Sequence, residues 1–195
     1  MQIMFLGSKL SRALAFVLLG FMLVGNVFSD VALSWVSNND GLAHIGMADG
    51  SYYDLKLSPD VEGVFYDGGK HKIESERYVS LFQVLHSNPN NPTGLCGTGN
   101  EVWLYVYKVT GTTLGARERV LVSSCLRSIS LASQNSGEAA QDTDFSSVQW
   151  NAQGFSIEWF DNVGAAGQPL SSTNYVLRDG VFLRQEVLSK ENQKK

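Results

Sequence analysis

Cysteine and histidine are scarce in this chain, and their scarcity limits the chemistry that it can perform. The 195 residues contain two cysteines, Cys96 and Cys125, and three histidines, His44, His71 and His86. There is no C-x-x-C pair, no histidine at ligand spacing to either cysteine, and no two histidines in one segment. We therefore expect no metal site and no catalytic thiol, and we expect the histidines to be surface or hydrogen-bonded residues.

Signature motifs of common enzymes are also missing. The sequence has no G-x-S-x-G, no H-E-x-x-H, and no S-x-x-K followed by the other penicillin-binding elements, which argues against the hydrolases that these motifs mark. Residues 97–101 (Gly-Thr-Gly-Asn-Glu) resemble half of a glycine-rich phosphate loop, but they precede a strand-like run, whereas a dinucleotide-binding loop follows a strand and opens a helix. These absences favour a binding protein over an enzyme, and no cofactor is expected.

Long apolar runs are confined to the N-terminus. Residues 1–12 carry Lys9 and Arg12 and no acid, and residues 13–24 are continuously apolar. This pattern predicts a signal peptide over residues 1–29, cleaved after Ser29. A permanent anchor is the alternative, but about a dozen apolar residues fall short of the roughly 18 to 20 that span a bilayer as a helix. We expect a periplasmic or secreted protein with no membrane attachment after cleavage.

Basic residues form no cluster in the remaining chain, apart from Lys190, Lys194 and Lys195 at the C-terminus. Removing Lys9 and Arg12 with the signal peptide leaves 13 basic and 19 acidic residues, so the net charge changes from −4 to −6. A negative surface repels phosphate backbones, so nucleic acid is not an expected partner. The acidity would suit a basic protein partner in the cell envelope.

Two cysteines in an exported chain predict one disulfide between Cys96 and Cys125. The bond would close a loop of about 30 residues, for which the chain-entropy estimate is roughly 3.5 kcal/mol of stabilisation. Because whole domains are stable by only about 5 to 15 kcal/mol, such a bond could decide whether the domain stays folded.

Short strand-like runs separated by turn residues fill the chain after the signal peptide. We expect strands at residues 31–36, 42–47, 51–57, 63–66, 78–86, 101–109, 119–131, 147–150, 154–160, 173–178 and 181–188. Asp49-Gly50 and Asp179-Gly180 predict hairpins, and apolar residues on both faces of 101–109 predict a central strand. The fold class is therefore all-β: residues 30–195 form one antiparallel β-sandwich or barrel-like sheet of about ten strands, with a small propeller-like arrangement as the alternative.

Several segments are expected to be loops, among them residues 161–172, which are polar and precede the last hairpin. Residues 87–99 contain Asn88-Pro89-Asn90-Asn91-Pro92, which excludes regular structure. Residues 110–116 predict a longer connection, and residues 132–146 have few large apolar residues and predict a mobile surface loop.

Candidate binding residues lie beside these loops. Asn100 and Glu101 stand at the entrance to the aromatic strand, where a carboxylate can be presented to a partner. Asp142 and Asp144, with Glu138 nearby, cover only part of a calcium-binding loop and are expected to be solvated acids available for binding.

The aromatic residues allow a further interpretation. The four tryptophans Trp35, Trp103, Trp150 and Trp159 could line a sugar-binding surface, although most aromatic residues of so small a sandwich belong to its core.

Three functional hypotheses follow. The first is a protein-binding factor of the cell envelope, such as an inhibitor or immunity protein against a cell-wall hydrolase or toxin. The second is an envelope hydrolase or carbohydrate-binding protein, using acids such as Glu101, Asp142 or Glu158. The third is a structural or assembly protein of the envelope.

Overall fold

A computed structural model describes residues 33–190, and the predicted signal peptide with its cleavage site lies outside the described residues. The described chain is nearly all β-structure, as predicted. Its elements are β1 (Ser34–Ser37), β2 (Leu42–Gly46), β3 (Tyr52–Lys56), β4 (Val61–Tyr66), β5 (His71–Ile73), β6 (Glu76–His86), β7 (Asn100–Thr110), β8 (Thr113–Ser124), β9 (Ser130–Leu131), the 3-10 turns η1 (Ser133–Asn135) and η2 (Gln141–Thr143), β10 (Val148–Asn151), β11 (Gly154–Asp161), β12 (Leu170–Arg178) and β13 (Val181–Leu188).

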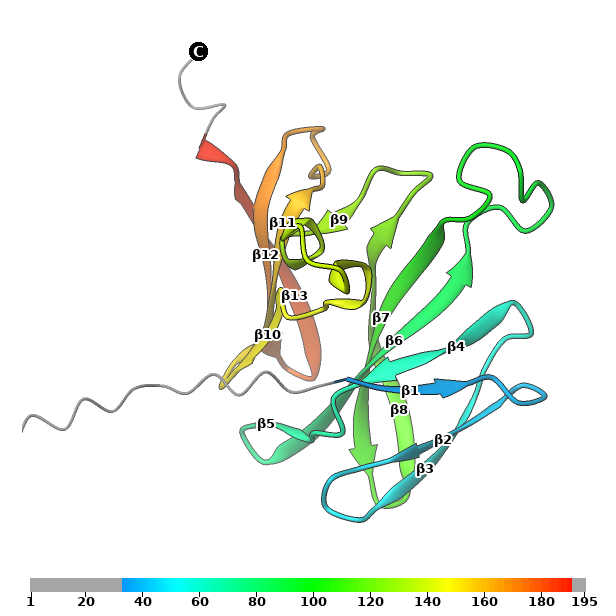
Figure 1. The fold of residues 1–195 in the computed structure, drawn as a ribbon. Helices are drawn as coiled ribbons and strands as arrows, with labels where there is room; N and C mark the ends of the chain where they lie inside the picture. The colour runs from blue at the N-terminus through cyan, green and yellow to red at the C-terminus, as the bar shows by residue number, and fades with distance from the viewer. Residues whose placement is uncertain (1–32, 191–195) are drawn as a thin grey trace, which may run out of the picture.

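The strands form three antiparallel units (Figure 1). A central sheet has the order β1-β4-β6-β7-β8, with β5 paired to β6. A C-terminal sheet has the order β10-β11-β12-β13, with β9 paired to β11, and β2 and β3 form a separate hairpin. Among the described residues the sheets do not close into a barrel, so the sandwich is the form of the prediction that is confirmed.

Two hydrophobic cores share the central sheet. One lies between the central sheet and the C-terminal sheet and includes Phe82, Leu104 and Phe155. The other lies between the opposite face and the β2–β3 hairpin and includes Leu81 and Ile45. Every residue from 78 to 84 is buried, so β6 serves both cores.

Strand β7 lies inside the sheet, between β6 and β8, as predicted, but one of its faces is only half-buried. There the guanidinium of Arg119 lies 3.7 Å from the Trp103 ring centroid and 5.3 Å from that of Tyr105. An arginine can cover these rings because its cationic group is attracted to aromatic faces while remaining hydrated.

Local turn chemistry produced the hairpins that were predicted. Residue pairs such as Ile45 and Tyr53 face each other across the Asp49-Gly50 turn. At the turn between β12 and β13, Asp179 has φ 51° and Gly180 has φ 78°, and two successive positive φ values match the twist of the flanking strands. Lys70 donates a hydrogen bond to Asp49 over 2.9 Å, which ties the β2–β3 turn to the connection between β4 and β5 and holds the pKa of Asp49 well below its usual range.

The connections between β7 and β9 differ from the prediction. The longer loop predicted at residues 110–116 is wrong, because β7 and β8 join through a tight turn at Gly111. The pairing of the two strands shifts register between Val106 and Tyr107. The single strand predicted at residues 119–131 is interrupted after Ser124, whose Oγ accepts a hydrogen bond from the backbone N–H of Arg127. This turn redirects the chain, so that β9 pairs with β11 of the other sheet.

The segment at residues 132–146 was predicted to be a mobile surface loop, and most of its residues are indeed exposed, but it is not without structure or anchorage. It contains η1 and η2 and lies between the two sheets (Figure 1). Its one large apolar residue, Phe145, is buried and stacks on Phe82 with ring centroids 4.3 Å apart. A single aromatic anchor therefore attaches an otherwise polar segment to the core.

Candidate functional site

Two surface features gather side chains with distinct chemistry. The first, the disulfide loop, comprises residues 87–99 and projects from the end of the central sheet (Figure 1). The second, the inter-sheet cleft, is a cavity of about 1040 Å³ between the central sheet and the chain from Glu138 to Trp150.

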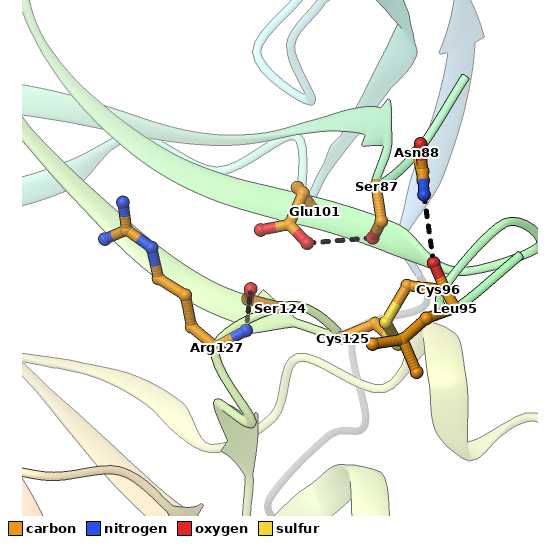
Figure 2. The surroundings of a disulfide bond; sticks show 8 residues. All are labelled: Ser87, Asn88, Leu95, Cys96, Glu101, Ser124, Cys125 and Arg127. Carbon is orange, nitrogen blue, oxygen red and sulfur yellow. Dashed lines mark hydrogen bonds between the residues drawn. A yellow bond between two sulfur atoms is a disulfide. The ribbon is translucent and has the colours of Figure 1, made fainter. Parts of the chain in front are cut away.

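The disulfide predicted between Cys96 and Cys125 is present, with 5.7 Å between the Cα atoms. The β7–β8 hairpin explains why they meet, because it pairs Glu101 with Ser124 and so places Cys125 beside the loop that precedes β7. Figure 2 shows the bond at the base of the disulfide loop.

Hydrogen bonds fix the shape of the disulfide loop. Four backbone bonds of 3.0 to 3.1 Å each join residues three apart between 88 and 99. The side-chain amide of Asn88 donates to the carbonyl of Leu95 over 3.1 Å (Figure 2). At Gly97 a Cβ atom would lie 2.2 Å from the carbonyl oxygen of Pro92, so only glycine fits where the loop folds back on itself.

Leu95 is the most exposed large apolar residue among those described, at 81%. It lies beside the disulfide (Figure 2), and residues 87–99 contain no Asp, Glu, Lys, Arg or His. The loop therefore holds one apolar side chain in water within a rigid, uncharged surface.

The predicted binding residues are divided between different places. Glu101 is half-buried, and its Oε1 accepts a 2.8 Å hydrogen bond from Ser87, so it braces the disulfide loop (Figure 2). Asn100 and Asp142 line one pocket of about 460 Å³ beside Cys125. Asp144 lines the inter-sheet cleft instead.

These acids do not converge on one catalytic or metal centre. Asp142 and Asp144 face different cavities, and Glu158 lines neither of them. Within residues 33–190 no three His, Cys, Asp or Glu side chains are grouped as ligands of a metal ion.

An ordered pair of aromatic rings forms one wall of the cleft. The imidazole of His71 stacks on Trp150 with centroids 4.3 Å apart, and its Nε2 lies 2.8 Å from Oδ2 of Asp67. The indole N–H of Trp150 donates to Oγ of Ser80 over 3.3 Å. Among the described residues no hydrogen bond joins Ser80 to His71, so this arrangement lacks the nucleophile–base contact of a hydrolase.

The tryptophans do not form one sugar-binding platform. Trp159 is buried and donates to Oγ1 of Thr173 over 2.9 Å. Trp103 lies beneath Arg119 on the other face of the central sheet. Only Trp150 lines the cleft.

The core behind this wall is closely packed, and both Phe155 and Tyr175 are buried in it. Phe155 lies 5.3 Å from Trp150 and stacks on Tyr175 with centroids 4.6 Å apart. Burial of the Tyr175 phenol raises the pKa of that group to about 12.

Sequence reasoning missed Leu95, Asp67 and His71 as site residues. The signal for Leu95 was present, since it is the only large apolar residue in the loop at 87–99. Asp67 and His71 gave no comparable signal, because their importance depends on Trp150, which lies about 80 positions later in the chain.

Comparison with known protein families, characterised proteins and solved structures finds no match for this chain. In residues 33–190 no helix is long and apolar enough to span a membrane.

Proposed function

We propose that the protein is an exported binding protein of the cell envelope that inserts its disulfide loop into an apolar pocket of a partner protein. In this role it acts as an inhibitor or immunity factor for that partner. The proposal rests on one observation: Leu95 is 81% exposed on a loop that the adjacent disulfide fastens to Cys125, at the end of β8.

Burial of Leu95 would supply a large share of the binding energy. Transfer of a leucine side chain from water into an apolar pocket contributes about 1.5 to 3 kcal/mol. The loop is already fixed by four backbone hydrogen bonds and the disulfide, so little conformational entropy is lost on binding. Ser87 and Asn88 already donate hydrogen bonds, to Glu101 and to the carbonyl of Leu95, so these donors contribute little to binding a partner.

The shape of the disulfide loop favours a protein that blocks a site on its partner over one that mimics the partner's substrate. Turn-forming hydrogen bonds recur from Asn88 to Gly99, so the loop is a compact wedge and not an extended strand. An extended segment would be needed to pair with a peptidase in the manner of a peptide substrate.

Export is part of the proposal. A disulfide is stable in the periplasm or outside the cell and is reduced in most cytosols, and the Cys96–Cys125 bond fits the first setting. Cellular fractionation tests this point: the mature chain should begin near Asp30 and be recovered from the periplasm or medium.

Affinity capture with paired variants tests the binding role. Immobilised mature protein is incubated with an extract of the source cell's envelope, using wild type, Leu95→Asp and the control Val163→Asp. Val163 is also an exposed apolar residue, at 55%, and lies in the connection between β11 and β12. We expect one partner to be retained by wild type and Val163→Asp, and its affinity for Leu95→Asp to be at least tenfold weaker.

Melting temperatures of the three proteins should be similar, because surface substitutions usually change stability by less than about 0.5 kcal/mol. Equal capture by all three proteins, or capture of no protein by wild type, would overturn the proposal.

A further inference from the structure

The inter-sheet cleft is separate from the disulfide loop and is large enough to hold a ligand. Its volume is about 1040 Å³, and none of residues 87–99 lines it. Sites for small organic molecules typically occupy about 300 to 1,000 Å³. The cleft therefore offers room for a ligand without any contribution from the loop.

Aromatic rings form the apolar part of the cleft. Phe145 stacks on Phe82 at 4.3 Å and lies 5.6 Å from Phe65, and all three line the cavity. These rings belong to the packed core or contact it, so their positions are set before any ligand arrives. Phe82 and Phe145 thereby hold the partly buried Phe65 ring in place, and an apolar body can bind against Phe65 without a large loss of side-chain entropy.

The charged groups of the cleft are almost all of one sign. Asp67, Glu138 and Asp144 line it, and no Lys or Arg does so among residues 33–190. Lys70 is close in sequence, but its ammonium is bound to Asp49. Even with His71 protonated, three carboxylates against one imidazolium leave the cleft negative.

Two of these carboxylates are held in fixed orientations. Asp67 accepts a 2.8 Å hydrogen bond from the backbone N–H of Gly69, and its other oxygen lies 2.8 Å from Nε2 of His71. Asp144 accepts a 2.8 Å hydrogen bond from the backbone N–H of Ser146. Fixed negative groups beside aromatic faces are the arrangement that recognises organic cations.

We propose that the inter-sheet cleft binds a small organic cation, an ammonium group attached to an apolar body. The apolar body packs against the partly buried rings of Phe65 and Trp150, and the ammonium group lies towards Asp67 and Asp144. A bare metal ion is a poorer fit, because calcium needs six to eight converging oxygen ligands and the acids of the described chain form no such cluster. An anionic ligand would be repelled.

Three matched probes test the charge requirement: 4-phenylbutylammonium, the neutral 4-phenylbutan-1-ol and the anion 4-phenylbutyrate. Binding to the mature protein is followed by tryptophan fluorescence and by amide chemical shifts. We expect saturable binding of the cation, at least tenfold tighter than the alcohol and tighter still than the anion. The shifts should centre on the backbone around Phe65 and on residues 143–150.

Two variants with a close control locate the site. Asp144→Asn and Glu138→Gln remove charge from the cleft, whereas Asp142→Asn removes the same charge from the neighbouring pocket. The first two should each weaken cation binding about five- to tenfold and leave binding of the alcohol unchanged. Asp142→Asn should have less than a twofold effect.

Equal affinity for cation and alcohol, no binding of the cation, or equal loss in Asp142→Asn and Asp144→Asn would each overturn the proposal. The outcome is independent of the disulfide loop, since the probes contain no protein partner.

Discussion

The disulfide loop and the inter-sheet cleft both offer apolar surface to water, but they are held in place in different ways. The loop turns Leu95 outward and depends on a covalent bond and local hydrogen bonds. The cleft turns the partly buried Phe65 and Trp150 inward and depends on packing between two sheets. The loop carries no charge, whereas three carboxylates line the cleft. In the folded protein, each region should therefore be impaired by substitutions that leave binding at the other region intact.

The largest effect is expected from Phe145→Ala. The substitution removes the buried ring that stacks on Phe82, and loss of a buried phenylalanine costs about 3 to 5 kcal/mol. Urea denaturation should show this decrease in the free energy of unfolding, and the cleft should lose its ligand. Below the melting temperature the loop should still capture its partner. Loss of loop binding in the folded variant would show that the two regions are coupled.

Replacing both Cys96 and Cys125 with serine should impair binding by the disulfide loop and leave binding in the cleft intact, the opposite of Phe145→Ala. The free energy of unfolding should fall by up to about 3.5 kcal/mol, the chain-entropy value for a loop of this length. Partner capture should weaken while the folded variant keeps its affinity for 4-phenylbutylammonium. Melting curves provide the control: wild type and variant should differ in oxidising buffer and coincide after reduction. Identical melts in both buffers would mean that the bond contributes nothing.

Alkaline pH should loosen the core behind the cleft. The pKa of Tyr175 is about 12 in the folded protein and about 10 in an unfolded chain. Between these values the unfolded chain loses a proton that the folded protein keeps, so stability is full below pH 10 and falls as pH rises to 12. The two-unit difference corresponds to about 2 to 3 kcal/mol.

Tyr175→Phe should make this decrease smaller in urea denaturation measured from pH 9 to 12. Part of the decrease should remain, because burial also raises the pKa of Tyr107. An unchanged pH profile in the variant would contradict the assignment to Tyr175.

The smallest expected effect is a difference between the two regions in how strongly salt weakens binding. Raising NaCl from 50 to 500 mM should weaken 4-phenylbutylammonium binding several-fold, because salt screens the carboxylates of the cleft. Partner binding through Leu95 should change less than twofold, since residues 87–99 carry no charge. Equal salt dependence in isothermal titrations would remove the distinction between the regions.

The parts of the fold that could be predicted depend on neighbouring residues. Asp49-Gly50 and Asp179-Gly180 specify hairpins through their own backbone conformations, and both hairpins formed. The pairing of the two cysteines needed only their number and the expected compartment. These inferences require no knowledge of how distant segments pack.

The parts that could not be predicted depend on contacts between distant residues. Phe145 lies in a polar stretch with no period, and only its stacking on Phe82 shows that the segment is anchored. The cleft likewise depends on Trp150 reaching Ser80, 70 positions earlier in the chain. Asn100 was selected at the entrance to the aromatic strand and Asp142 as a solvated loop acid, and their meeting in one pocket had no local signal.

The double burial of β6 has a consequence for how the chain can be divided. Because alternate residues such as Leu81 and Phe82 contribute to different cores, removal of either the β2–β3 hairpin or the C-terminal sheet would expose one face of the same strand. Neither half can then be excised as an independent folding unit. We expect a single cooperative transition in which the loop and the cleft lose their shapes together, even though they act separately in the native protein.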